Sequence, residues 1–167
     1  GTRNAYPLLR SDGSVVTELI KSVRVLNPPQ ASATPRLLRG EGGSGLQTTV
    51  RRFLSTFATR SSKDYGYNAN AITGIDWNSS YNSLPGNLEG VTAPLLMIGM
   101  TGFFLVPGIE LAYDHAGSRD KTLVFVEGAD HHGEPCKECE SFAGEFGDTV
   151  TRTFDYIDGW LSQTERF

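Results

Sequence analysis

Two adjacent histidines follow an apolar run that is typical of a buried strand. The run Leu123-Val124-Phe125-Val126 is followed by Glu127-Gly128-Ala129-Asp130 and then by His131 and His132. Open α/β sheets gather their ligands at the carboxyl ends of their strands. An imidazole there can take a proton from a hydroxyl group and return it to a leaving group. We therefore predict that His131 is the general base and acid, with His132 as its competitor.

A catalytic histidine of this kind is usually oriented by a carboxylate. Asp76, in the polar and aromatic stretch Gly74–Tyr81, is the candidate acid. Its alternative role is that of a turn residue whose carboxylate caps its own backbone. Glu110 and Asp114 lie on a predicted helix, where we expect them to be solvated charges. The acid can equally belong to another chain.

Aromatic side chains accompany these polar candidates. We predict that Phe103 and Phe104, just past the end of a predicted strand, and Trp77 line a substrate pocket, since ligand pockets are mostly apolar with a few polar groups. The alternative is that the same side chains pack a lid against the core.

Cys136 and Cys139 form a C-x-x-C motif close to His131 and His132. Histidine and cysteine are zinc ligands, but structural zinc sites usually take their ligands from two separated segments. A local disulfide or a pair of buried thiols is the favoured interpretation, and we expect no metal and no other cofactor.

The elements that position these residues form a recognisable pattern. Leu95-Leu96-Met97-Ile98 and Leu123-Val124-Phe125-Val126 read as buried strands, and Pro107 to Gly117 reads as a helix between them. Strand, helix and strand at this spacing predict a parallel crossover and an α/β fold for residues 92–167. A closing helix is predicted from one apolar face. That face comprises Val150, Phe154, Ile157, Trp160 and Leu161.

Residues 1–91 are less regular. Extended runs are predicted at 15–20 and 23–26, a Gly- and Ser-rich loop at 30–46, and loops again at 61–90. Val50, Phe53, Leu54 and Phe57 predict one apolar helical face. Two parallel strands do not make a stable sheet, so we expect another chain to complete it.

The second half of the chain resembles the end of an α/β-hydrolase. The resemblance runs through Ala93–Gly102, the helix Pro107–Gly117, Asp120–His131 and the closing Phe154–Leu161. It implies that 92–167 is the C-terminal part of the hydrolase core, with the last two parallel strands, the crossover helix and the closing helix. It implies that 1–91 is a lid-like insertion, and that the loop after the final strand carries the catalytic histidine, His131.

Two departures shape what the resemblance implies about activity. The sequence contains no G-x-S-x-G motif, since Gly42-Gly43-Ser44-Gly45 is followed by Leu46. The usual acid position reads Gly102-Phe103-Phe104. We therefore expect the serine nucleophile on a partner N-terminal chain, and a serine-hydrolase-type enzyme that cleaves an ester, lactone or related acyl bond of a small molecule. The alternatives are a non-catalytic binding or regulatory subunit and a small His/Cys metal-binding domain.

Composition limits the other classes of function. The chain has 167 residues, 15 Lys and Arg against 19 Asp and Glu, and a net charge of −4. Without a basic block, binding to nucleic acid through phosphate groups is not expected. The longest mainly apolar run, 93–106, is shorter than the roughly 20 residues of a membrane span, so no membrane partner is expected. These features predict a soluble protein, and two cysteines fit a cytoplasmic or a secreted location.

Overall fold

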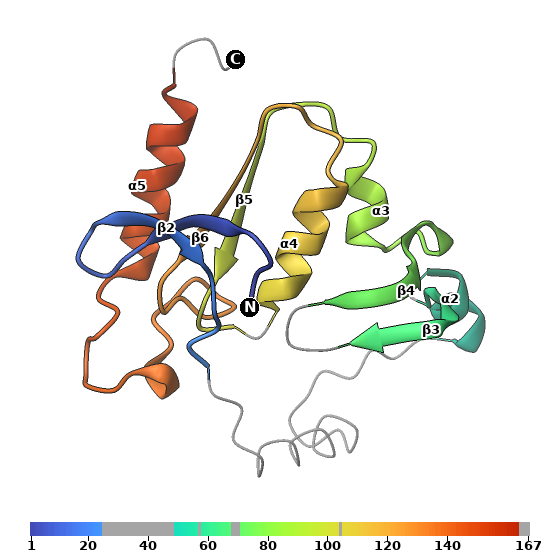
Figure 1. The fold of residues 1–167 in the computed structure, drawn as a ribbon, viewed down its shortest axis with the longest axis horizontal. Coiled ribbons are helices and arrows are strands. Elements are labelled where there is room, and N and C mark those ends of the chain that lie inside the picture. Colours follow the sequence, from blue (N-terminus) through green and yellow to red (C-terminus); the bar gives the residue numbers. More distant parts are fainter. Residues whose placement is uncertain (25–48, 57, 68–70, 104, 164–167) are drawn as a thin grey trace.

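The core of the computed structural model is a four-stranded sheet with helices on both faces (Figure 1). The structure describes residues 1–24, 49–56, 58–67, 71–103 and 105–163. The sheet has the order β2-β1-β6-β5. β1 pairs with β2 in antiparallel fashion and with β6 in parallel, and β5 also pairs with β6 in parallel. The predicted α/β class is therefore confirmed. The strands are β1 (Ala5–Leu9), β2 (Val15–Leu19), β5 (Leu95–Met100) and β6 (Lys121–Val126).

The predicted parallel crossover is present. β5 and β6 run in register from the pair Leu95 and Lys121 to the pair Met100 and Val126. Helix α4 (Val106–His115) connects them, with Pro107 in its first turn. Proline fits there because the first amide groups of a helix have no intrahelical partner.

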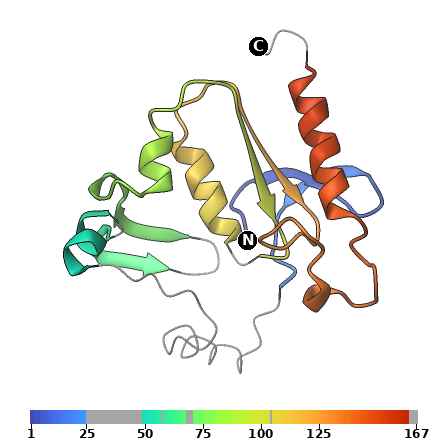
Figure 2. The same ribbon diagram turned by 180° about the vertical axis from the view of Figure 1, so that it is seen from behind.

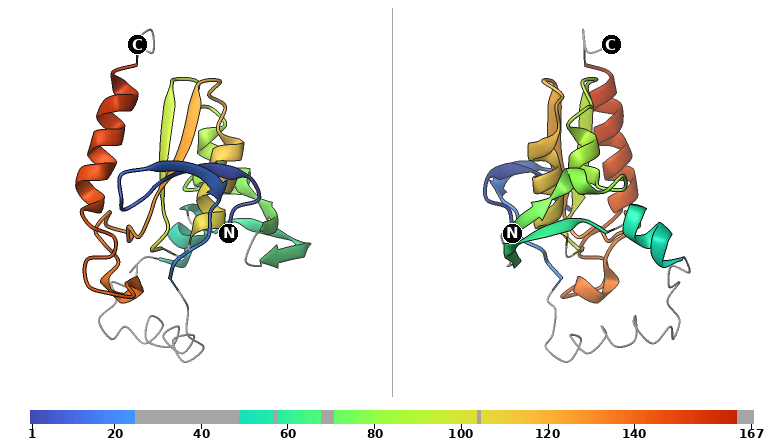
Figure 3. Two further views of the ribbon diagram at one scale, coloured as in Figure 1. Left: turned by 60° about the vertical axis from the view of Figure 1, so that its left-hand side comes forward. Right: turned by 90° about the vertical axis from the view of Figure 1, so that its right-hand side faces the viewer.

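Helices α4 and α5 (Thr149–Leu161) lie on opposite faces of the sheet (Figures 2 and 3). Side chains along a strand alternate between faces, and β6 follows this rule. Leu123 and Phe125 join the buried cluster that also contains Ala112 of α4. Val124 and Val126 join the other cluster, against which Tyr156 of α5 packs. Alternation thus explains why both faces of β6 are buried.

Two of the four strands come from the first 24 residues of the chain. β2 agrees with the predicted extended run at 15–20, but β1 was not predicted, because Pro7 interrupts its apolar pattern. The pairing of β1 with β6 covers Leu8 and Leu9, just beyond that proline. The two strands predicted for residues 92–167 are therefore joined in one sheet by two strands from the start of the chain, and a partner chain stays a prediction.

A second, smaller unit lies beside α4 and consists of a two-stranded antiparallel hairpin with short helices. Strands β3 (Arg60–Tyr67) and β4 (Ile72–Asp76) occupy much of the segment predicted as loops, which corrects that prediction. The 3-10 helix η2 (Trp77–Ser79) and helix α3 (Leu84–Leu88) follow. Both β4 and α3 contact α4.

Helix α2 (Val50–Thr56) precedes this hairpin. It forms where the apolar spacing predicted a helix, and it buries none of its residues. The exposed fraction of Val50 is 76% and that of Leu54 is 61%. Phe57, the run at 25–26, the loop at 30–46 and the Gly42–Leu46 string lie outside the described residues.

The closing helix forms as predicted, but not with the predicted buried face. Trp160 is buried and its indole N–H donates to Thr122 Oγ1 at 3.1 Å. Phe154 and Leu161 are exposed, with 65% and 50% of their surface accessible. The helix meets β6 instead through residues such as Tyr156. No helix in the described part of the chain is long and apolar enough to cross a membrane.

The carboxyl group of Glu110 is buried, contrary to the prediction of a solvated charge. Its exposed fraction is 1%, and it accepts backbone N–H groups from Arg3 at 2.8 Å and Asn4 at 2.9 Å. Burial acts to raise the pKa of Glu110, but these hydrogen bonds outweigh it and hold the pKa below its ordinary value. Glu110 thereby ties the start of the chain to α4. Asp114 remains partly exposed and pairs with the Arg3 guanidinium.

Candidate functional site

The turns that leave β5 and β6 are joined by hydrogen bonds. Thr101 N–H donates to Val126 O at 3.2 Å, and Thr101 Oγ1 accepts Gly128 N–H at 2.8 Å. Gly102 N–H donates to Ala129 O at 2.8 Å. Gly128 has a φ of +70°, a conformation that favours glycine. These two turns, called the β5 exit (101–103) and the β6 exit (127–131) below, are therefore held side by side. Each contains a candidate site residue.

The loop after β6 is a tight hairpin that contains both histidines. Ala129 and Pro135 pair as an isolated antiparallel bridge, which closes the hairpin at its base. Asp130 N–H donates to Glu134 O at 2.7 Å, and Asp130 Oδ1 accepts His132 N–H at 2.7 Å. Asp130 thus stabilises the turn that displays His131.

His131 and Phe103 meet across the two exits. Their ring centroids lie 4.6 Å apart with planes inclined by 25°, which is a stacked arrangement. The histidine comes from the β6 exit and the phenylalanine from the β5 exit. Both residues were predicted site residues, and the structure brings them together although they lie 28 positions apart in the sequence.

Both rings line a cavity of about 480 Å³ between β5, α4 and the segment from β4 to α3. Trp77 lies on its wall as well, so three of the predicted site residues share one cavity. His131 is the one titratable side chain among the described residues of its lining. The remaining lining residues are Ile72, Leu84, Pro85, Ile98, Gly99, Met100, Leu105, Val106, Gly108, Ile109, Leu111 and Ala112.

Sequence reasoning missed most of this apolar wall. Leu105, Ile109 and Ala112 follow one another at helical spacing, so a face of α4 could have been proposed from the pattern. No sequence pattern predicts Ile72 or Pro85 as lining residues, because their positions depend on how the unit of β3, β4 and α3 packs against α4.

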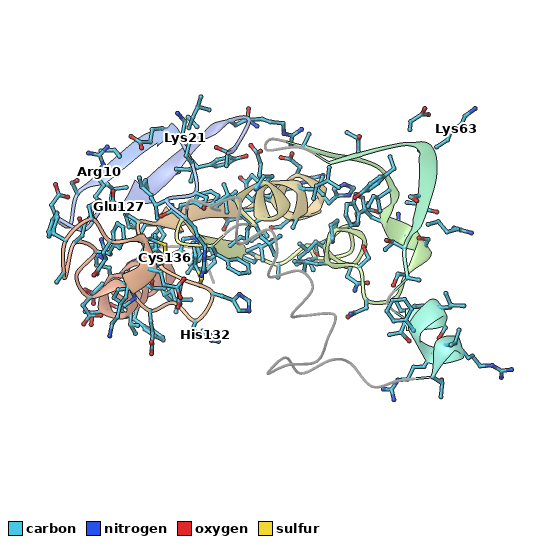
Figure 4. All side chains as sticks on the ribbon, turned by 90° about the horizontal axis from the view of Figure 1, so that it is seen from below. Arg10, Lys21, Lys63, Glu127, His132 and Cys136 are labelled. Atoms are coloured by element: carbon cyan, nitrogen blue, oxygen red, sulfur yellow. A yellow bond between two sulfur atoms is a disulfide. The ribbon has the colours of Figure 1, made fainter. Side chains whose placement is uncertain are left out.

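His132 is placed differently from its neighbour. Its ring is 5.5 Å from that of His131, edge to face, and it is not among the lining residues of the cavity. Figure 4 shows its side chain extending outward from the loop cluster. The geometry therefore favours His131 over His132 as the residue that faces a bound ligand.

Asp76 is engaged in its own loop. Its carboxylate accepts Asn78 N–H at 3.2 Å and pairs with Arg60 at 2.9 Å. Within the described residues it has no hydrogen bond to His131, and it occupies the capping position that was its alternative role. Asp76 as the catalytic acid remains a prediction. Phe104 lies outside the described residues.

Cys136 and Cys139 form a disulfide, which agrees with the favoured interpretation of the motif. Their sulfur atoms are thereby bonded to each other, and thiolates are the form in which cysteine binds zinc. Within the described part of the chain, no group of three or more His, Cys, Asp or Glu side chains is arranged to hold a metal ion.

The arrangement can bind a small apolar molecule and present it to an imidazole. A general acid or base must lie within hydrogen-bond distance of the group that reacts. Because His131 lines the cavity, a molecule bound there would lie next to its imidazole. Comparison of the chain with family models, with curated proteins and with solved structures gives no match.

Proposed function

We propose that this chain is the histidine-bearing part of a serine-hydrolase-type enzyme that cleaves an ester, lactone or related acyl bond. The observation that carries the proposal is the stack of His131 on Phe103 on the lining of an apolar cavity, beyond the carboxyl ends of two parallel strands. The resemblance to α/β-hydrolases, drawn from the sequence, supports the same role for His131.

In the proposed reaction, His131 works with a serine supplied by a partner chain. The imidazole takes the proton of the serine hydroxyl as its oxygen attacks the acyl carbon. The tetrahedral intermediate then collapses, the bond to the alcohol oxygen breaks, and the imidazolium gives its proton to that oxygen. Water hydrolyses the acyl-serine by the same exchange of protons, which restores the free hydroxyl.

The cavity indicates the chemical class of substrate. A volume of about 480 Å³ suits a small organic molecule, because such sites commonly span roughly 300–1,000 Å³. Apart from His131, the described lining residues carry no ionisable side chain, so a charged acyl group would lose its hydration without gaining a partner. The favoured substrate therefore has a neutral, apolar acyl group.

One observation favours a second candidate, a non-catalytic binding subunit. Apart from His131, the described lining residues are apolar or aromatic, so the cavity can bind a ligand without any chemistry. In that case His131 would contribute a stacking surface and a hydrogen bond. The two candidates differ in whether His131 is needed for turnover or for affinity alone.

Turnover of p-nitrophenyl butyrate by the chain assembled with its serine-bearing partner separates them. We expect His131→Ala to lower kcat at least about 100-fold, because general acid and base catalysis contributes that much or more. His132→Ala is the matched control and should keep most of the activity. Fluorophosphonate labelling of the partner's serine should fall with His131→Ala. Equal turnover by the two histidine variants would contradict the proposal.

A further inference from the structure

The Cys136–Cys139 disulfide lies beside the candidate site and has one buried and one partly accessible half. Cys136 has an exposed fraction of 4%, and Cys139 is only half-buried. Cys136 caps the start of the short 3-10 helix η3 (Lys137–Cys139), and Cys139 is its last residue. In Figure 4, Cys136 lies within the loop cluster from which His132 extends.

Cys136 packs directly on the turn that carries Phe103. A methyl group placed on Gly102 would lie 2.7 Å from Cys136 Cβ and 2.6 Å from Ala129 O, closer than such atoms approach. Cys139 Sγ lies 3.9 Å from Gly102 O. Both cysteines of the disulfide and Ala129 of the β6 exit therefore lie close to Gly102 of the β5 exit.

The disulfide begins where the arm of the His131 hairpin is closed by backbone pairing. Pro135, which completes the bridge to Ala129, is followed immediately by Cys136. Cys136 N–H donates to Gly128 O at 2.8 Å, and Cys139 N–H donates to Cys136 O at 2.8 Å. The returning arm of the hairpin is thus held at Cys136, five residues from His131 (136 minus 131).

We infer that Cys136 and Cys139 form a reversible redox site whose oxidised state positions His131 against Phe103. With the disulfide formed, Cys136 is bonded to Cys139, and both residues lie against Gly102 of the β5 exit. With two free thiols, the arm from 136 to 139 gains rotational freedom, and the stack of His131 on Phe103 loosens. The functional importance of this stack rests on the proposed function, whereas the movement itself does not.

Reduction of the disulfide requires an external dithiol, which supplies the two electrons. One thiolate of the dithiol attacks Sγ of Cys139, the more exposed of the two cysteines, and the bond between the two protein sulfurs breaks. Cys136 leaves as a thiolate and takes up a proton. The second thiol of the reductant then attacks the mixed disulfide and releases Cys139. The protein gains two electrons and two protons, and the dithiol becomes a disulfide.

The test uses the whole chain, labelled with ¹⁵N, with and without dithiothreitol and without denaturant. Alkylation and intact mass count the thiols, hydrogen exchange follows the amides of 129–135, and NMR follows contacts between the rings of His131 and Phe103. We expect two thiols per chain after reduction, exchange at least about tenfold faster in the hairpin, and weaker contacts between the two rings. Amides that join β1 and β2 should not change, and reoxidation should restore the starting spectrum.

Two variants act as controls. The pair Cys136→Ser with Cys139→Ser should resemble the reduced protein and should not respond to dithiothreitol. Cys139→Ala keeps the buried thiol of Cys136 and serves if the double variant does not fold. A disulfide that resists the dithiol while the chain is folded would overturn the inference. So would complete reduction with unchanged exchange at 129–135. None of these measurements uses ester turnover, so they can fail or succeed independently of the proposed function.

Discussion

The candidate site depends on a few hydrogen bonds that hold two residues together across neighbouring strand ends. Thr101 and Gly102 at the β5 exit bond to Gly128 and Ala129 at the β6 exit, and the rings of Phe103 and His131 then stack. The position of His131 just past a strand could be predicted because a buried strand followed by a polar loop is a local pattern. Its contact with Phe103 could not, because that contact depends on how the two exits are bonded.

The stack can be tested with a substitution that keeps an apolar side chain but removes the aromatic face. We expect Phe103→Leu to weaken the interaction between residue 103 and the His131 ring by about 1 kcal/mol, since aromatic pairs contribute roughly that much beyond their burial. Ester turnover should then fall about fivefold with KM less affected. Kinetics of the assembled protein measure this, with His132→Ala as the matched control. Unchanged turnover would show that the stack does not position His131.

At the scale of elements, the N-terminal strands complete a sheet that the β5–α4–β6 crossover alone would leave incomplete. Leu8 of β1 belongs to the buried cluster that also contains Phe125 of β6. Leu19 of β2 is instead exposed, with 56% of its surface accessible. Leu8 and Leu19 therefore allow a buried and an exposed leucine to be compared within the same pair of strands.

We expect Leu8→Ala to lower the free energy of unfolding by about 3 kcal/mol, because it leaves a cavity in the core. Leu19→Ala should change it by less than about 0.5 kcal/mol, as surface substitutions usually do. Urea denaturation followed by circular dichroism gives both values. Equal effects of the two substitutions would contradict the placement of β1 in the sheet.

The packing between β5 and β6 depends on the missing side chain of Gly99. A methyl group there would lie 2.3 Å from Cε1 of Phe125, a ring that is fully buried. We expect Gly99→Ala to destabilise the chain by about 2 kcal/mol through overpacking.

Gly108→Ala is the control, since Gly108 lines the same cavity and an added methyl group would meet its nearest neighbour, Leu105 Cβ, at 3.8 Å. Alanine is the better helix former, so this change should be neutral or stabilising by up to about 1 kcal/mol. Thermal unfolding of the two variants measures the contrast, and a Gly99→Ala protein as stable as the original would contradict the packing described.

At the scale of the whole molecule, contacts between distant parts of the chain decide what the sequence could and could not predict. The crossover and both long helices were predicted because apolar periodicity and Pro107 are local signals. Strands β1, β3 and β4 were not, since each acquires its pairing from a partner strand rather than from an apolar pattern of its own. Glu110 was misjudged for the same reason, because its partners lie more than 100 positions away at Arg3 and Asn4.

Glu110 also makes the stability of the chain depend on pH. Its pKa in the folded chain is held below its ordinary value of 4.5. The carboxylate therefore contributes its full stabilisation above about pH 4.5 and loses it as the pH falls through the folded pKa. Glu110→Gln should cost about 2 kcal/mol at neutral pH, since it weakens charge-assisted hydrogen bonds.

The variant should also lose less stability than the original chain between about pH 6 and about pH 3. Urea midpoints across this range measure the difference, with Glu18→Gln on the surface of β2 as the control. Parallel pH profiles for the original chain and Glu110→Gln would show that Glu110 does not hold the N-terminal segment.

An acyl compound is proposed to bind in the cavity against His131. The most direct measurement is an NMR titration of the 167-residue chain with ethyl butyrate, a small neutral ester. We expect concentration-dependent shifts of the His131 and Phe103 rings and of the Trp77 indole, and much smaller shifts of the His132 ring. If the ester leaves these three residues unshifted up to its solubility limit, or shifts His132 as strongly as His131, the account is contradicted.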